Sequence, residues 1–227
     1  MKQGEANTTR GALDAQHLHW TKTLSNKPEM FGDEPSNPAR KAAEVFRKEG
    51  TTKVLELGGG QGRDTMFFAQ SGFEVTVLDY AESGVEAITQ KAQTLELSQS
   101  ITAICHDVRT ALPFGNDSFD GCYSHMLYCI ALTTSELEFL SEEVRRVLRS
   151  GGLNIYTVRH THDLDYGKGI ERGEDMYEVG GFIVHFFSKE KVEHLAEGHE
   201  IIEIDEFEEG RLPRKLFRVT LRKNKKV

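Results

Sequence analysis

The sequence predicts an α/β domain built on a doubly wound, mostly parallel sheet whose last strands are antiparallel. Between residues 51 and 158, short β-branched runs alternate with stretches whose apolar residues recur at helical spacing, which is the pattern of successive βαβ units. A glycine-rich segment at residues 58–62 joins the first run to the first helical stretch. Near the C-terminus, a short connection around residues 210–213 separates two more β-type runs, which favours an antiparallel pair.

Five strands are expected in the alternating part of the chain. Each is a short run rich in β-branched or large apolar residues, and glycine or polar residues bound it. The ranges are 54–57, 73–79, 101–105, 119–124 and 153–158.

Helices should connect these strands. The first is expected to begin near Gly62 and to stop at Gly72, because a glycine at positive φ commonly follows the last helical residue. Thr133, with Glu136 three residues later, fits a capping box at the start of a later helix. The apolar residues at helical spacing in the second and third helices are Val85, Ile88, Ala92 and Leu95, then Leu137, Leu140, Val144 and Val147.

The pattern changes after residue 158. Ser188 can cap a short helix through Ala196, and the two last strands should span 201–207 and 216–221. Two segments fit no part of this scheme, and long irregular segments in compact domains are usually functional or disordered. We therefore expect an N-terminal lid segment, residues 1–36, and one domain, residues 37–227, with an inserted loop at 160–181 that also serves as a lid.

Composition restricts the partners and the compartment. The net charge of −8 repels phosphate backbones and anionic membrane surfaces, so neither nucleic acid nor a membrane is an expected partner. Three cysteines without CxxC spacing indicate a reducing compartment. There is no run of about 18 apolar residues and no signal-peptide core. We expect a cytoplasmic protein, a monomer or homodimer, with a small-molecule partner.

The first strand meets the first helix in the segment ELGGGQG, residues 56–62. Glycines at such a junction let backbone amides approach a ligand at the helix N-terminus, which indicates a nucleotide-like cofactor. The dinucleotide fingerprint G-x-G-x-x-G requires a glycine where this chain has Arg63, so the spacing here is G-x-G-x-G instead.

The pattern E-x-G-x-G-x-G, carried by Glu56, Gly58, Gly60 and Gly62, resembles the first motif of the class I S-adenosylmethionine-dependent methyltransferases. Three later features resemble the same family in order and spacing: Asp79 at the end of the second strand, HDV after the third, and VLRSGG before the fifth, where the family commonly has Pro in place of Ser. The strings GGGQGRDTMFFA and LPFGNDSFD further resemble the tellurite-resistance and thiopurine branch, which methylates small soft nucleophiles.

This resemblance implies a Rossmann-like, seven-stranded sheet, mostly parallel with an antiparallel last strand, that binds S-adenosylmethionine and yields S-adenosylhomocysteine. In such a family Asp79 would hold both ribose hydroxyls, and Asp107 with the Val108 amide would contact the adenine. Tyr80 is a candidate to flank the adenine or ribose. The residues expected to hold the cofactor are Glu56, Gly58, Gly59, Gly60, Gly62, Asp79, Tyr80, Asp107, Val108 and Ser124.

Methyl transfer from a sulfonium is an in-line displacement that requires alignment and exclusion of water, and we expect no metal. A hydroxyl or ammonium acceptor must lose a proton, whereas a soft anion needs no base. His125 follows the fourth strand and His160 the fifth, at the edge where ligands lie in such folds, so both are candidate catalytic residues. His185 stands in an apolar run and is expected to be a buried structural histidine.

The expected function is therefore in-line methyl transfer from S-adenosylmethionine to a small-molecule acceptor. Aromatic and apolar residues between His17 and Phe31 should fold over the cofactor, because disordered segments contain few such residues. One alternative is a protein or RNA methyltransferase, which the acidic charge disfavours. Another is a module that binds S-adenosylmethionine without catalysis.

Overall fold

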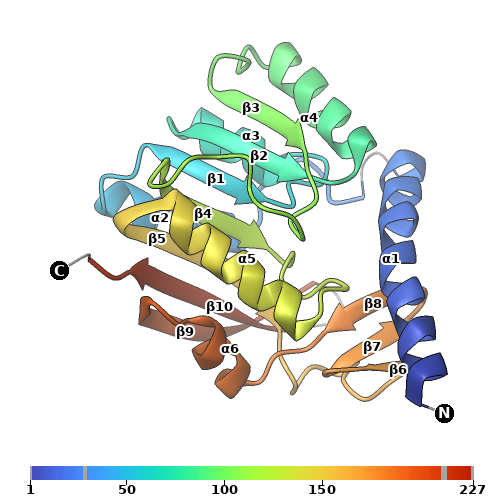
Figure 1. Cartoon of the computed structure of the whole chain (residues 1–227). Helices are drawn as coiled ribbons and strands as arrows, with labels where there is room; N and C mark the ends of the chain where they lie inside the picture. The colour runs from blue at the N-terminus through green and yellow to red at the C-terminus, as the bar shows by residue number, and fades with distance from the viewer. Residues whose placement is uncertain (1, 28–29, 211–213, 226–227) are drawn as a thin grey trace.

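A central seven-stranded sheet with helices on both faces forms the body of the protein (Figure 1). The computed structural model describes residues 2–27, 30–210 and 214–225. Within them the sheet has the strand order β3-β2-β1-β4-β5-β10-β9. The strands are β1 (Lys53–Leu57), β2 (Glu74–Asp79), β3 (Ile101–Cys105), β4 (Phe119–His125), β5 (Leu148–Arg159), β9 (His199–Glu209) and β10 (Arg214–Lys223).

The directions of the strands confirm the predicted sheet. Strands β1 to β5 pair in parallel, and β10 is antiparallel to both β5 and β9. The largest differences from the predicted ranges are in three strands: β5 begins at Leu148, which pairs with Phe119 before an irregularity, β9 extends to Glu209, and β10 spans Arg214–Lys223. Of the predicted connection at 210–213, residues 211–213 lie outside the described residues.

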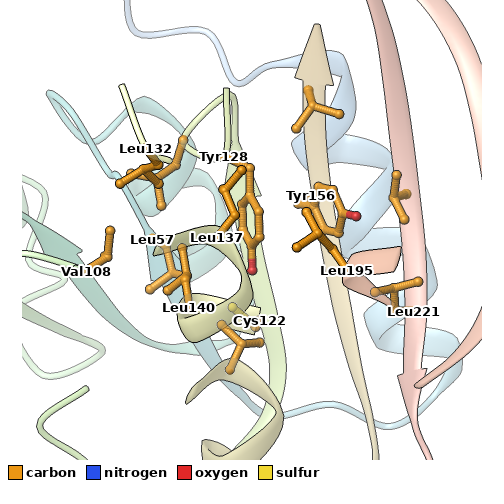
Figure 2. Packing of buried hydrophobic residues seen from close by; sticks show 14 of the residues in the cluster. Leu57, Val108, Cys122, Tyr128, Leu132, Leu137, Leu140, Tyr156, Leu195 and Leu221 are labelled. Carbon is orange, nitrogen blue, oxygen red and sulfur yellow. The ribbon is translucent and has the colours of Figure 1, made fainter. Parts of the chain in front are cut away.

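Helices cover the two faces of the sheet, as a doubly wound arrangement requires. On one face α2 (Asn37–Lys48) and α3 (Arg63–Gln70) pack around Phe46, Phe68 and Tyr123, while α4 (Glu82–Thr94) packs with α3 against β2. On the other face lie α5 (Thr134–Val147) and α6 (Lys189–Leu195). Figure 2 shows this second face, where leucines of α5 and α6 meet the stacked rings of Tyr128 and Tyr156.

Local sequence explains where these helices begin. The predicted capping box of α5 is present, since the Thr133 side chain accepts from the Glu136 amide and the Glu136 carboxylate accepts from the Thr133 amide. Helix α2 was not predicted. It has a plain signal, because Ser36 caps it by accepting from the Ala39 amide and Pro38 stands in its first turn.

The segment expected as an inserted loop contains strands, so its irregular character was wrongly predicted. Strands β6 (Ile170–Gly173), β7 (Met176–Val179) and β8 (Phe182–His185) form a separate three-stranded antiparallel sheet. Its turns have two residues each, Glu174-Asp175 and Gly180-Gly181, all at positive φ. Such turns match the twist of a hairpin, but strands of four residues and many charges hid the alternation.

The N-terminal segment forms a long helix, α1 (Lys2–Asn26), which the sequence analysis did not predict. Figure 1 shows α1 running across the edge at which β1 to β4 end, between α4 and the β6–β8 sheet. Contacts with α4 and β8 agree with this position. No helix in the described part of the chain is both long and apolar enough to cross a membrane.

A buried carboxylate anchors the segment that leads from α1 to the domain. Asp64, in the first turn of α3, accepts hydrogen bonds from the Ser36 amide (2.7 Å), the Ser36 hydroxyl (2.7 Å) and the Tyr123 hydroxyl (3.1 Å). It is only 4% exposed, so these donors have no access to bulk water if the carboxylate is lost. One side chain thus joins α2, α3 and β4.

Replacing Asp64 by Ala should destabilise the protein by about 2–4 kcal/mol, because buried donors lose their partner. Urea unfolding followed by circular dichroism measures the change. Glu44→Ala is the matched control, since the Glu44 side chain is 63% exposed and pairs with Lys41 on its own helix. A loss in Asp64→Ala no greater than in the control would contradict the anchoring role.

Candidate functional site

The glycine loop after β1 is a tight turn at the carboxyl edge of the sheet. A Cβ at Gly59 would lie 2.4 Å from Val77, and a Cβ at Gly62, whose φ is 85°, would lie 2.8 Å from Ile88. Gly58 donates its amide to the Leu78 carbonyl (2.7 Å), which ties the loop to the end of β2. Only glycine fits Gly59 and Gly62, because a side chain would displace β2 or α4.

Asp79 ends β2 beside this loop. Its carboxylate accepts the amides of Gly60 (2.7 Å) and Ala81 (2.9 Å), one on each oxygen. Burial raises the pKa of Asp79, while these two hydrogen bonds limit the rise. Each carboxylate oxygen can accept a second hydrogen bond, so the side chain is fixed in place and still able to bind a ligand hydroxyl.

Glu56, at the other end of the motif, is buried beneath the loop. Its carboxyl group accepts the hydroxyl of Thr65 in α3 at 2.6 Å and is 3% exposed as a residue. Burial, followed by the negative charges of Asp64 and Asp79, raises the pKa of Glu56 to about 8. The group is therefore largely protonated at neutral pH, which lets three acidic residues share one small region.

Next to Tyr80, which follows Asp79, a narrow recess of about 20 Å³ lies between α1 and the ends of β2 and β3. Tyr80, Asp107 and Val108 line it from the sheet side, and Leu13, Gln16 and His17 from α1. Three of the expected cofactor residues are thus brought together, and α1 closes the space over them.

Helix α1 is fastened over this recess by polar contacts at several points. His17 donates Nε2–H to the Tyr80 carbonyl (3.0 Å), and Gln16 bonds both Gly181 and Ile183 of the β6–β8 sheet. At its C-terminal end, the Gln61 amide of the glycine loop donates to the carbonyls of Leu24 and Lys27. Residues Leu24 and Lys27 therefore lie against the glycine loop, and Phe31 lies 3.5 Å from a Cβ position at Gly60.

Asp107 is already paired with a neighbouring cation. The Arg109 guanidinium donates to both carboxylate oxygens, at 2.7–3.1 Å, and also reaches Asp14 on α1 at 2.8 Å. Burial alone would raise the pKa of Asp107, but the hydrogen bonds from Arg109 hold it below its usual value. The sequence analysis missed Arg109, which stands only two residues away.

Ser124 lies beside the start of the glycine loop. It is fully buried near the end of β4, pairs with Leu57 just before the loop, and its hydroxyl has no hydrogen-bond partner among the described residues. Several other buried polar atoms share this property, for example those of Tyr128 and Tyr156, so it does not by itself mark a binding site.

His125, the last residue of β4, is held on both sides of its ring. Nδ1 lies 2.8 Å from the Thr157 hydroxyl of β5, and Nε2 lies 3.2 Å from a carboxylate oxygen of Glu209 at the end of β9. Burial would raise the pKa of Glu209, but the hydrogen bond and charge of His125, with the charges of Arg63 and Arg214, lower it. Sequence reasoning missed Glu209, because β9 lies far from β4 along the chain and only the fold joins them.

The second catalytic candidate, His160, has a packed position. Its ring stacks on Phe217 of β10 at 4.6 Å, Nδ1 accepts from the His162 amide, and 3% of the residue is exposed. His185 is buried as expected: Nδ1 donates to the Leu132 carbonyl, Nε2 accepts from Lys191, and burial lowers its pKa to about 4. His125 thus pairs with a carboxylate at the strand ends, whereas the ring of His160 is stacked on Phe217 and bonded to the His162 amide.

Together these features fit a ligand with an adenosine-like end and a polar end. The glycine loop, Asp79 and the recess beside Tyr80 occur side by side, and the unpaired Ser124 hydroxyl offers a further polar contact. The pairing of Arg109 with Asp107 is a contact that such a ligand would have to rearrange. The fold and this edge define an α/β protein with a nucleotide-type cofactor site at the switch point of the sheet.

Comparisons with known proteins agree with this class. Residues 54–152 match the family described as "Methyltransferase domain". The chain is 26% identical over 178 residues to 24-methylenesterol C-methyltransferase 2 of Oryza sativa subsp. japonica, covering 71% of this chain and 47% of the relative. The chain spans about half the length of the curated relatives it matches.

Solved structures share the fold over most of the chain. One is the 1,6-didemethyltoxoflavin-N1-methyltransferase of Burkholderia thailandensis, with a TM-score of 0.74, 18% identity, and coverage of 93% of this chain and 88% of the other. Another is TehB of Haemophilus influenzae, with a TM-score of 0.67, 18% identity, and coverage of 90% and 67%. Residues 54–152 thus match a methyltransferase-domain family, and most of the chain shares the fold of these methyltransferase structures.

The raised pKa of Glu56 makes the stability of the protein depend on pH. A carboxyl whose pKa is higher in the folded than in the unfolded state stabilises the fold fully below about 4.5, and this stabilisation is lost as pH rises through about 8. The slope is at most about 1.4 kcal/mol per pH unit. Glu56→Gln, which stays neutral, should remove this slope.

Urea unfolding of the wild type and of Glu56→Gln at several pH values between about 5 and 8 measures the difference. Because other titrating groups are common to both proteins, the difference isolates Glu56. Parallel stability curves for the two proteins would mean that Glu56 is ionised in the folded state.

Proposed function

We propose that this protein is a methyltransferase that uses S-adenosylmethionine to methylate a small molecule. The observation that carries the proposal is the junction of the glycine loop with Asp79, at the edge where the recess opens. The family match and the fold support it independently. When bound there, S-adenosylmethionine supplies an activated methyl group on a sulfonium.

The residues of the chain take distinct roles in this proposal. Gly58, Gly59, Gly60 and Gly62 let the backbone approach the ligand, and Asp79 accepts the ribose hydroxyls. Tyr80 and Val108 line the adenine recess, with Asp107 as a polar contact that Arg109 must share. Glu56 and Ser124 lie under the polar end of the ligand, where one holds a proton and the other an unpaired hydroxyl.

A small acceptor fits the covered carboxyl edge of the sheet better than a macromolecule does. Helix α1 and the β6–β8 sheet cover the strand ends from one side, which leaves limited room for a protein or RNA chain. The net charge of −8 also disfavours a polyanionic partner. We propose a cytoplasmic protein, monomeric or homodimeric, that works without a nucleic acid or membrane partner.

We further propose that residues 1–36 act as a lid. Gln61 joins the glycine loop to the end of α1, and Asp64 joins α3 to Ser36, so both ends of the segment that follows α1 are tied to the cofactor loop. A closed lid excludes water, which favours alignment over hydrolysis. His125 stays on the acceptor side of the site, whereas the stacked ring of His160 serves packing.

The direct test is calorimetry with S-adenosylmethionine and S-adenosylhomocysteine, followed by a screen of small amines, thiols and metalloid oxyanions for cofactor-dependent formation of S-adenosylhomocysteine. Binding with turnover supports the proposal. Binding without turnover on any acceptor would instead support a module without catalysis, and absence of binding would refute both.

Asp79→Ala should weaken the binding of S-adenosylmethionine at least about tenfold, because each charge-assisted hydrogen bond contributes about 1.5–3 kcal/mol. Asp79→Asn is the matched variant, since it keeps one acceptor for the Gly60 amide without the charge. Calorimetry on both variants, with unfolding curves to show that they are folded, decides the matter. Unchanged affinity in a folded Asp79→Ala would remove the ribose assignment.

Gln61→Ala should loosen the C-terminal half of α1, because the carbonyls of Leu24 and Lys27 lose their side-chain donor. Hydrogen exchange should rise in residues 18–27 of the variant, and cofactor affinity should fall severalfold. The wild type should gain protection there when S-adenosylhomocysteine is added. Equal exchange with and without ligand would argue against a lid.

A further inference from the structure

The pair formed by Glu209 and His125 lies where an acceptor must approach. Glu209 ends β9 and His125 ends β4, with Thr157 of β5 between them, so the pair spans the carboxyl edge beside the switch point of the sheet. Arg63, the first residue after the glycine loop, acts on the same carboxylate through its charge. Glu209 therefore faces the cofactor loop from the acceptor side.

The hydrogen bonds hold the histidine ring in one orientation. Nε2–H faces Glu209, because a carboxylate oxygen accepts hydrogen bonds. The Thr157 hydroxyl, which accepts from the Met126 amide at 3.0 Å, has a proton to donate to Nδ1 and a lone pair to accept from it. Both ring nitrogens are engaged, which leaves His125 without a free atom for a substrate.

Glu209, in contrast, keeps a free acceptor. Only one of its oxygens has a hydrogen-bond partner among the described residues, and 24% of the side chain is exposed. Arg63 donates to the Phe31 carbonyl and lies 3.8 Å from Asp64, and within the described part of the chain neither it nor the exposed Arg214 forms an ion pair with Glu209. One oxygen of Glu209 is thus held by His125, and the other has no hydrogen-bond partner in the described part of the chain.

We infer that Glu209 binds the acceptor and selects a neutral nitrogen nucleophile, an amine or N-heterocycle, over thiolates and oxyanions. This inference rests on the proposed function. In the reaction, the nitrogen lone pair forms a bond to the methyl carbon, the carbon–sulfur bond breaks, and its electron pair stays on sulfur. Positive charge moves from sulfur to nitrogen, where the Glu209 carboxylate stabilises it. Any proton on the methylated nitrogen leaves to water after release.

His125 and Thr157 are positioning residues in this arrangement. They hold one oxygen of Glu209 so that the other faces the acceptor, and the low pKa of the carboxyl keeps it charged across neutral pH. A thiolate or metalloid oxyanion would bring a second negative charge against this oxygen, which the site opposes.

The first test needs no knowledge of the natural acceptor. With S-adenosylhomocysteine bound, N-methylpyridinium resembles a methylated product, and benzenesulfonate has a similar ring with the opposite charge. Titration calorimetry should show that the cation binds more tightly, and that Glu209→Gln weakens it about tenfold. Glu208→Gln, an exposed neighbour on β9, should leave it unchanged. Equal binding of the two probes, or no effect of Glu209→Gln, would overturn the inference.

The second test compares acceptors. Glu209→Gln should lower kcat/KM about 10- to 100-fold for imidazole and benzylamine, and raise any activity with 2-mercaptoethanol or tellurite, because the opposing negative charge is removed. Binding of S-adenosylmethionine should be unaffected. A preference of the wild type for the thiol or tellurite would overturn the nitrogen assignment while leaving the methyltransferase function intact. Failure to bind S-adenosylmethionine would refute the proposed function itself, and the two failures are therefore distinct.

Discussion

The arrangement of three buried carboxyl groups around the glycine loop is the constraint on which the rest of the structure depends. Glu56, Asp64 and Asp79 are each less than a tenth exposed, and three such charges cannot all be ionised in one small region at low cost. The protein resolves the conflict by giving each a different role. Glu56 holds a proton, Asp64 accepts three donors from α2 and β4, and Asp79 accepts the loop amides.

These roles connect the cofactor loop to the parts of the chain that cover it. Because Asp64 holds Ser36 and Gln61 holds the last carbonyls of α1, the position of the N-terminal segment depends on the conformation of the loop. Gln16 extends the connection to the β6–β8 sheet through Gly181 and Ile183. Helix α1 and the β6–β8 sheet carry no sequence motif of their own. Side chains within or next to the glycine motif position α1, and α1 in turn holds the β6–β8 sheet.

The sequence predicted the sheet, the capping box of α5 and the glycine loop, because each depends on residues close together in the chain. It failed where distant segments meet. Glu209 reads as one more carboxylate on an acidic strand, and only the antiparallel return of β9 brings it to His125. The β6–β8 sheet was missed for a different reason: its strands have four residues each, and their many charges hid the alternation of apolar and polar side chains.

The charge at the proposed acceptor site bears on how far the resemblance to one family branch predicts the acceptor. The strings around the loop resemble a branch that acts on soft anions, yet they lie in the glycine loop, α3 and the turn leading into β4, which in our proposal support the cofactor rather than the acceptor. The proposed acceptor site lies at the ends of β4, β5 and β9, and there the chain places a carboxylate whose pKa is lowered and which has one oxygen without a hydrogen-bond partner among the described residues. Since charge moves onto the acceptor during methyl transfer, the sign of that one group bears more directly on acceptor choice than the loop sequence does.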